Sequence, residues 1–225
     1  MRITSTAPRR FHDRQDAGRQ LARELHALAG IPDLLVLGLP RGGVPVAAEI
    51  ARVLQCQLDV VLVRKVGVPG FAELAMGAVA AIGGNRSTVR NEGVLAGLAG
   101  DGNTIFEAAA SRERIELARR DLLYRSERLP PTVKDRSVVL VDDGVATGAT
   151  LRAAVETVRQ LQPKQLMVAV PVFLGQSLAD TQTVADRTFW LWDAPSLGSV
   201  GQAYRHFEPV PDEEVIRLLQ GGPRE

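Results

Sequence analysis

The sequence predicts an α/β fold in which an open, mainly parallel sheet is flanked by helices. Three continuous apolar runs carry this prediction, at Leu34–Leu39, Val138–Val141 and Leu166–Val172. Apolar runs without alternation are typical of strands that are buried on both faces, as in parallel sheets covered by helices. The first two runs each lead through a turn of small residues into a segment with helical periodicity. In open α/β sheets, ligands bind beside such turns, at the carboxyl ends of the strands.

Length, charge and cysteine content narrow the class of protein. A chain of 225 residues is long enough for one large domain with a substantial core. The net charge of +1 gives no electrostatic footprint for nucleic acid. The single cysteine, Cys56, excludes an internal disulfide and a cysteine-based metal cluster, and we expect it to be a buried structural thiol.

The sequence also lacks the signals of a membrane or secreted protein. No apolar run reaches membrane-spanning length, and Met1–Arg10 lacks the apolar segment of a signal peptide. We therefore expect a cytoplasmic protein without membrane contact.

The first helix is predicted over residues 13–29, where Leu21, Leu25 and Leu28 recur at helical spacing. The sequence Gly30–Pro32 marks its end. Packing against the rest of the protein is the expected role of this helix.

A small-residue turn, Pro40–Gly43, follows the first apolar run and precedes a helical segment at Val44–Leu54. Two such turns at one edge of a sheet can clamp two anionic groups of one ligand. The alternative is a glycine-rich turn with a solvated arginine.

The next strand is predicted at Leu58–Val63, and residues 64–74 are expected to form a functional loop after it. Its two cations, Arg64 and Lys65, are of the kind that bind phosphate oxygens. The alternative is that both are ordinary surface cations.

A hairpin is predicted between Met76 and Arg90, because the runs Gly77–Ile82 and Ser87–Arg90 flank the turn sequence Gly83–Asn85. A rigid hairpin that extends the sheet and a mobile hairpin are both compatible with this pattern.

A long polar helix is predicted over residues 103–128, with charged side chains placed for i,i+4 pairs. The two expected pairs are Glu116 with Arg120 and Asp121 with Arg125. The narrow apolar stripe on which the helix is expected to pack consists of Ile115, Ala118 and Leu122.

The stretch Val138–Thr150 carries the strongest chemical signal. Two acids, Asp142 and Asp143, end the apolar run, and a turn of small residues leads to the start of a helix. Glycine lets backbone N–H groups come close to a ligand, and the helix start adds unpaired N–H groups, so the turn predicts a phosphate site. The two carboxylates would repel phosphate, but they suit sugar hydroxyls or a magnesium ion. A sugar phosphate satisfies both requirements.

Two further strands are predicted, at Leu166–Val172 and Thr188–Trp192, and a short helix at Glu213–Leu219. Trp190 and Trp192 lie on the same side of the last strand, where they either pack in the core or form the floor of a pocket.

The run Val138–Thr150 closely resembles the phosphoribosyl-diphosphate (PRPP) motif of type I phosphoribosyltransferases, which have a Rossmann-like sheet. The resemblance implies that Asp142 and Asp143 are the catalytic acids, which face the ribose hydroxyls and hold Mg²⁺ directly or through PRPP and water. The residues that it assigns to the 5-phosphate of PRPP are Ala146, Thr147, Gly148, Ala149 and Thr150.

The same resemblance makes the turn after the first core strand the diphosphate loop, which in this family often contains a non-proline cis peptide. The residues assigned to the diphosphate are Arg41, Gly42, Gly43, Arg64 and Lys65. Residues 1–225 would then form one domain, with an insert that carries a flexible hairpin lid at about 64–135 and a small hood at about 193–225. The tail from Val200 to Phe207 resembles the hood segment of the family, which assigns Tyr204 and Phe207 to the acceptor. His206 stands where an acid is common, so the identity of the acceptor stays open.

The implied function is Mg²⁺-dependent transfer of the 5-phosphoribosyl group from PRPP to a small, nitrogen-containing acceptor, with release of diphosphate. No nucleic-acid partner is expected, and a homodimer is compatible with the resemblance. A regulator that binds PRPP or a nucleotide without efficient turnover is the alternative. A synthase that makes PRPP would need an ATP site, for which the sequence shows no motif.

Overall fold

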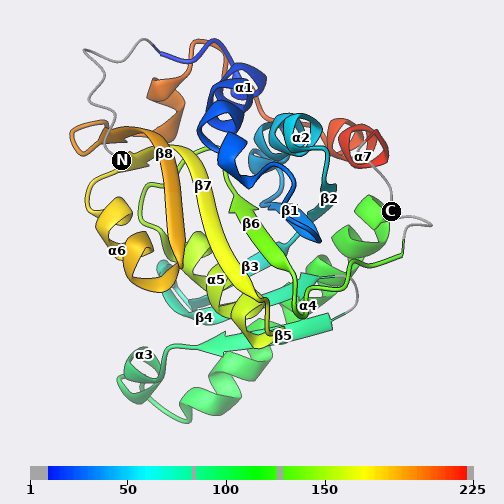
Figure 1. The fold of residues 1–225 in the computed structure, drawn as a ribbon. Coiled ribbons are helices and arrows are strands. Elements are labelled where there is room, and N and C mark those ends of the chain that lie inside the picture. The colour runs from blue at the N-terminus through cyan, green and yellow to red at the C-terminus, as the bar shows by residue number, and fades with distance from the viewer. Residues whose placement is uncertain (1–9, 83–84, 126–128, 222–225) are drawn as a thin grey trace.

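Two sheets form the framework of the fold (Figure 1). The computed structural model describes residues 10–82, 85–125 and 129–221. The strands are β1 Leu34–Gly38, β2 Gln57–Val60, β3 Leu62–Val68, β4 Phe71–Ile82, β5 Asn85–Arg90, β6 Ser137–Val141, β7 Gln165–Leu174 and β8 Arg187–Ala194. The α-helices are α1 Arg14–Glu24, α2 Gly43–Leu54, α3 Glu92–Ala96, α4 Gly102–Arg125, α5 Ala149–Gln160, α6 Ser177–Val184 and α7 Asp212–Gln220, and 3-10 turns lie at His26–Leu28 and Val200–Ala203.

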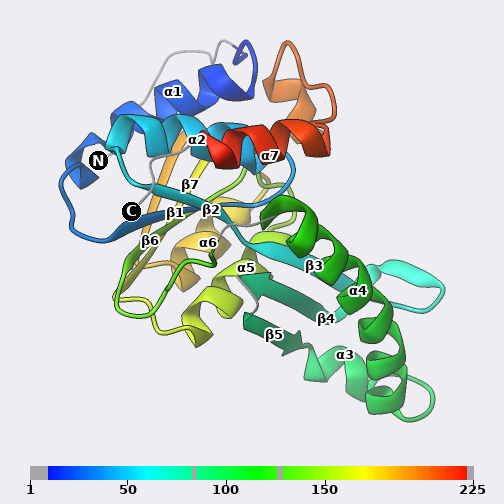
Figure 2. The same ribbon diagram turned by 90° about the vertical axis from the view of Figure 1, so that its right-hand side faces the viewer.

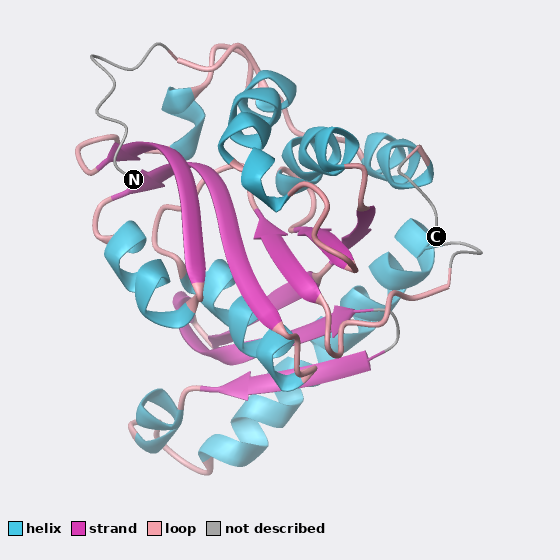
Figure 3. Cartoon of the chain, viewed as in Figure 1, coloured by secondary structure: helices cyan, strands magenta, loops and turns pink. Residues whose placement is uncertain are grey.

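The larger sheet has the strand order β2-β1-β6-β7-β8, and all neighbouring strands are parallel (Figure 3). Every residue of β1 and of β6 is buried, as the continuous apolar runs predicted. The predicted α/β class with a parallel sheet is confirmed, and β6 is its central strand.

Helices cover both faces of this sheet. Figure 2 shows α1, α2 and α7 on one side, and α5 and α6 with the smaller sheet on the other. The three leucines of the predicted first helix, Leu21, Leu25 and Leu28, are fully buried as expected. The helix is shorter than predicted, because α1 ends at Glu24 and Leu28 lies in the 3-10 turn that follows. Cys56 is also buried, and burial raises the pKa of its thiol to about 11. Trp190 and Trp192 are half-buried and pack against core clusters, which supports their packing role.

The smaller sheet is antiparallel, with the order β3-β4-β5, and it contacts α4 and α5. It corrects the expectation of a functional loop over residues 64–74, because residues 64–68 continue as strand β3 and residues 71–74 begin strand β4. The pairing of β3 with β4 satisfies the backbone of this segment, and Val66 and Val68 supply its buried side chains. A short break at Val61 allows the chain to leave the larger sheet.

The predicted hairpin between Met76 and Arg90 is confirmed by the antiparallel pairing of β4 with β5. It joins the smaller sheet and does not extend the larger one. Gly83 and Gly84 of its turn lie outside the described residues. The segment Ala78–Ile82 is buried, so this part of the insert is core, whereas the β3–β4 hairpin projects outward in Figure 2. Closure of a lid stays a prediction.

Helix α4 confirms the predicted long helix up to Arg125, and the expected end at 126–128 lies outside the described residues. Arg120 bonds Glu116 at 2.8 Å and Arg125 bonds Asp121 at 2.6 Å, as the spacing predicted. The predicted apolar stripe is wrong, because Ile115 and Leu122 are 73% and 77% exposed. The residues of α4 that are buried are Phe106, Ala110, Leu117, Tyr124 and Arg125.

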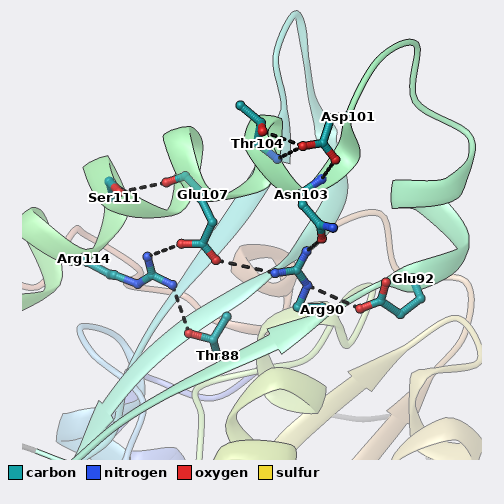
Figure 4. Close-up of polar contacts among 9 residues, drawn as sticks. All are labelled: Thr88, Arg90, Glu92, Asp101, Asn103, Thr104, Glu107, Ser111 and Arg114. Carbon is teal, nitrogen blue, oxygen red and sulfur yellow. Dashed lines mark hydrogen bonds and ion pairs between the residues drawn. The ribbon is translucent and has the colours of Figure 1, made fainter.

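Polar contacts fix both ends of α4. At its start, Arg90 of β5 pairs with Glu107, which also accepts a hydrogen bond from Arg114 at 2.8 Å (Figure 4). Near its end, the buried guanidinium of Arg125 donates to Asp59 of β2 at 2.6 Å. Burial of Arg125 and Asp59 is tolerated because the two side chains are paired, and this pair turns the Arg125 side of α4 inward. Within the described part of the chain, no helix combines the length and apolar character needed to span a membrane.

Two substitutions on α4 test which of its faces is packed. Leu117→Ala should lower the free energy of unfolding by about 2–5 kcal/mol, because it leaves a cavity at a side chain that is 2% exposed. The same change at the exposed Leu122 should cost less than about 0.5 kcal/mol. Urea denaturation followed by circular dichroism measures both, and equal losses would contradict the assignment of the buried face.

Candidate functional site

The two predicted turns meet at the carboxyl ends of β1 and β6. These strands are neighbours, and the chain proceeds from β1 to β2 on one side and from β6 to β7 and β8 on the other. Such a reversal of strand order creates a crevice, which is the usual ligand site of open α/β sheets. The backbone N–H of Leu39 donates to the carbonyl of Val141 at 2.8 Å, so the two turns begin side by side.

Glycine is required where the turns touch. A Cβ atom on Gly42 would lie 1.9 Å from Oδ2 of Asp143, and one on Gly43 would lie 2.6 Å from the carbonyl oxygen of Val141. No side chain fits at these distances. The absence of side chains therefore lets the backbone of the first turn lie directly against the acids of the second.

The two acids are held in fixed orientations. Oδ1 of Asp142 accepts a hydrogen bond from the backbone N–H of Asp143 at 2.8 Å. Oδ2 of Asp143 accepts one from Nε of Arg14 at 2.6 Å. Within the described part of the chain, no other residue donates a hydrogen bond to Oδ2 of Asp142 or to Oδ1 of Asp143, so each acid keeps one oxygen for a ligand.

Burial sets the electrostatics of this pair. It raises the pKa of Asp142 above its usual range, and the neighbouring charge of Asp143 raises this pKa further. Burial also raises the pKa of Asp143, and the Arg14 guanidinium opposes that rise. Two adjacent buried carboxylates therefore favour a ligand that brings hydroxyl donors or a cation.

The two acids suit a magnesium ion only as part of its coordination shell. Magnesium is commonly bound by one or two carboxylates, with water and ligand phosphates completing its shell. Within the described residues, no group of three or more His, Cys, Asp or Glu side chains could hold a metal by itself. Asp142 and Asp143 thus suit a metal that arrives with a phosphorylated ligand.

The turn after the acids opens toward solvent and then starts a helix. Gly148 has a φ of 74°, a left-handed conformation that favours glycine, and α5 begins at the next residue. The first N–H groups of an α-helix have no partner within the helix. Two residues of this turn, Ala146 and Thr147, and the first two residues of α5, Ala149 and Thr150, are exposed. The turn therefore has the chemistry of the predicted phosphate site.

Strand β7 holds the base of this turn in place. Val145 donates its N–H to the carbonyl of Val172 at 3.0 Å and accepts one from Leu174 at 2.8 Å. The hydroxyl of Ser177 donates to the Val145 carbonyl as well. These hydrogen bonds fix the backbone at Val145, directly before the exposed residues of the turn.

The first turn contains the cis peptide that the family resemblance implied, at the Pro40–Arg41 bond. The side chain of Arg41 is 43% exposed, and its nearest acid is Asp212 of α7, at 4.0 Å. The turn itself lies in the site, and the Arg41 side chain is only loosely engaged by the protein.

Arg64 and Lys65 are placed differently from the expectation. Both lie on strand β3, and Nε of Arg64 donates to Glu113 of α4 at 2.7 Å. Lys65 is exposed. Among the described residues, neither side chain has a recorded contact with either turn, because the chain has already left the larger sheet at this point. Their predicted contact with a diphosphate stays a prediction.

The hood segment lies beside the acids. The ring of Tyr204 is 3% exposed, and its hydroxyl donates to the backbone carbonyl of Asp143. Phe207 stacks on Tyr204 with ring centroids 4.9 Å apart, and the Arg14 guanidinium lies 3.8 Å from the centroid of Phe207. Tyr204 therefore supports the acid turn, and its predicted contact with an acceptor stays a prediction.

Arg14 is the site residue that sequence reasoning missed. It is the first residue of α1 and lies 129 positions before Asp143 in the chain. An arginine at a helix start next to the capping Asp13 carries no signal of a distant ion pair. Only the packing of α1 beside the hood brings it to the acids.

Comparison with known proteins identifies related chains. Residues 10–195 match the sequence model of the family described as "Phosphoribosyl transferase domain". Protein Rv0571c of Mycobacterium tuberculosis H37Rv, whose name provisionally assigns it to the phosphoribosyl transferases, is 42% identical over 215 residues, which are 96% of this chain and 47% of that protein. The chain thus spans about half the length of the curated relatives that it matches first. The crystal structure of TT1426 from Thermus thermophilus superposes with a TM-score of 0.82 and 43% identity, over 94% of this chain and 98% of that one.

One substitution tests the close approach of the two turns. Gly42 has a φ of −65°, which alanine adopts easily, so an effect of Gly42→Ala reports the close contact of its Cβ with Asp143 and with the Arg14 that pairs with it. We expect it to lower the free energy of unfolding by about 1–3 kcal/mol in urea denaturation. Gly97→Ala is the control, because its Cβ would have only ordinary contacts. Equal stability of the two variants would contradict the described contact.

Proposed function

Because the chain belongs to the phosphoribosyl transferase domain family, we propose that it transfers the 5-phosphoribosyl group of PRPP to a nitrogen atom of a small acceptor, with release of diphosphate. One observation carries the proposal, the meeting of the turn Pro40–Gly43 with the acids and helix start of Asp142–Thr150. The site offers separate places for a phosphate, a ribose and a diphosphate, which are the three parts of PRPP.

The 5-phosphate would bind at the start of α5. Exposed threonine hydroxyls, the N–H groups of the first helical turn and the positive end of the helix dipole all favour an anion there. We assign this role to the five residues Ala146, Thr147, Gly148, Ala149 and Thr150. The left-handed conformation of Gly148 turns the chain into the helix.

The ribose would lie over the two acids. Oδ2 of Asp142 and Oδ1 of Asp143 are available to accept hydrogen bonds from the 2- and 3-hydroxyl groups. Magnesium, which these oxygens fit, would supply charge neutralisation for the leaving diphosphate. These contacts fix the sugar so that its anomeric carbon faces the incoming acceptor.

The diphosphate would lie against the first turn, where Gly42 and Gly43 expose their backbone. Arg41 adds a side chain that is 43% exposed and free to reach phosphate oxygens, since its 4.0 Å contact with Asp212 is long for an ion pair. Arg64 is paired with Glu113, so we leave Arg64 and Lys65 out of the proposed site.

In the proposed reaction, a nitrogen of the acceptor forms a bond to the anomeric carbon as the bond to diphosphate breaks. No covalent intermediate with the protein is needed. The contribution of the chain would be position, placement of charge beside a cation-like sugar, and exclusion of water. The β3–β4 hairpin, with the exposed side chains of Phe71 and Leu74, is a candidate for the part that excludes water.

The acceptor would enter beside the hood. Val200 contacts the site closely, since a Cβ on Gly144 would lie 2.3 Å from its Cγ1 atom. The ring of His206 contacts that of His12 in a tilted arrangement, with ring centroids 4.9 Å apart, so its side chain is engaged with the N-terminal segment. The acceptor contact predicted for Phe207 stays a prediction, because this ring is stacked on Tyr204 and Arg14.

The test is the double variant Asp142→Asn/Asp143→Asn. We expect it to fold and to lose PRPP binding or PRPP-dependent diphosphate release, because the amides offer neither the charge nor the acceptor pattern of the acids. The readouts are calorimetric PRPP binding with Mg²⁺ and diphosphate release with purine, pyrimidine and non-base acceptors. Asp180→Asn is the control, because Asp180 lies on α6 with a weak 3.9 Å ion pair.

Three outcomes distinguish the hypotheses. Loss of PRPP binding in the double variant alone supports the site. Unchanged affinity and turnover in that variant would refute the assignment. Tight PRPP binding by the wild-type protein without diphosphate release for any acceptor would favour a PRPP-binding regulator.

A further inference from the structure

We propose that Arg14 is a positioning residue of the PRPP site, which aims the carboxylate of Asp143 and joins the hood to it. This inference rests on the proposed function. It concerns a residue outside both strand-end turns, on the first helix of the chain.

The ion pair between Arg14 and Asp143 is shielded from solvent. The Arg14 side chain is 11% exposed, the Asp143 side chain is 14% exposed, and Nε lies 2.6 Å from Oδ2. Hydrogen bonds in which both partners are charged are stronger than neutral ones, and weak screening at a shielded site preserves that strength. The contact therefore determines where the Asp143 carboxylate points.

The geometry leaves Asp143 one orientation. Its Oδ2 is confined between Arg14 and the backbone of Gly42, where a Cβ atom would lie within 1.9 Å of it. With Oδ2 fixed in this way, Oδ1 is the oxygen that can serve a ribose hydroxyl or a metal. Arg14 would act on PRPP through Asp143, without touching the ligand itself.

The other end of the guanidinium binds the hood. NH1 of Arg14 donates to the backbone carbonyl of Glu208 at 2.9 Å, and the guanidinium plane covers the ring of Phe207. Phe207 stacks on Tyr204, and the Tyr204 hydroxyl donates back to the carbonyl of Asp143. These contacts form a closed ring from Arg14 through the hood to the acid and back.

Backbone pairing supports the same connection. Phe11 donates its N–H to Ala203 at 2.9 Å, and it accepts one from Arg205 at 2.9 Å. The segment directly before Arg14 is thus bonded to the hood segment. Helix α1, the hood and Asp143 are joined as one unit, in which the Arg14 side chain contacts Asp143, Phe207 and Glu208.

Lysine cannot replace this arginine fully. A planar guanidinium can donate to a carboxylate with one nitrogen, donate to a carbonyl with another and stack on a ring at the same time. A lysine at position 14 would keep one charged contact with Asp143 and lose the stacking on Phe207. An alanine would lose every one of these contacts.

A double-mutant cycle tests whether Arg14 acts through Asp143. PRPP affinity is measured by calorimetry with Mg²⁺ for the wild-type protein, Arg14→Ala, Asp143→Asn and the combination of both. We expect Arg14→Ala to weaken PRPP binding about tenfold or more, the size of effect of a lost charged hydrogen bond. In the Asp143→Asn background the same change should weaken PRPP binding by less than about threefold, because the effects of substitutions at contacting residues are not additive.

Two further variants distinguish a positioning role of Arg14 from an effect of its substitution on folding. Arg14→Lys should bind PRPP with an affinity between those of the wild-type protein and Arg14→Ala. Arg19→Ala, on the same helix and with a 3.6 Å contact to Glu49, should bind as the wild type does. If thermal unfolding shows that Arg14→Ala is not folded, Arg14→Lys in both backgrounds carries the same cycle.

The outcomes are distinct for the two proposals. Non-additive losses together with partial recovery by Arg14→Lys support the positioning role. Wild-type affinity in Arg14→Ala, or equal losses from Arg14→Ala in the two backgrounds, would overturn the positioning role and leave the proposed function intact. A wild-type protein that does not bind PRPP would overturn the proposed function and this inference with it.

Discussion

The close approach of two turns at the carboxyl ends of β1 and β6 is the constraint on which the rest of the structure depends. Gly42 and Gly43 have no side chains, and that alone allows the first turn to lie against Asp142 and Asp143. The parallel sheet supplies the adjacency, since its strand order reverses between these two strands. One edge of the sheet thereby combines an acid pair, an exposed helix start and a backbone turn.

The close approach of the two turns also has an electrostatic consequence for the residues around the acid pair. Two neighbouring carboxylates are shielded from water, which disfavours their charged forms. Arg14 from the N-terminal helix offsets part of that cost, and the hood residues Tyr204 and Phe207 hold the arginine and the acid turn together. Helix α1 and the hood segment therefore meet beside the acids, and their role is to support the site.

The parallel sheet, the long helix and the two turns could be predicted from the sequence, because continuous apolar runs and small residues report directly on local structure. The buried face of α4 could not, since Arg125 is buried through its pair with Asp59 and Leu122 is exposed. Because β3 pairs with β4, Arg64 lies on a strand and not in the expected loop. The role of Arg14 depends on a contact across 129 residues, for which local sequence carries no signal. Sequence reasoning thus brought the two turns and the acid pair to one edge of the sheet and missed the contact of Arg14.

The central claim is that both turns bind one ligand at the same time. Calorimetric titration of the wild-type protein, in the presence of Mg²⁺, with PRPP, ribose 5-phosphate and diphosphate tests it most directly. A site that engages both ends of the ligand predicts that PRPP binds at least about a hundredfold more tightly than either fragment, since a second anchored group adds its contacts without a second loss of translational freedom. PRPP binding no tighter than that of ribose 5-phosphate would contradict the account, because the first turn would then contribute nothing to recognition.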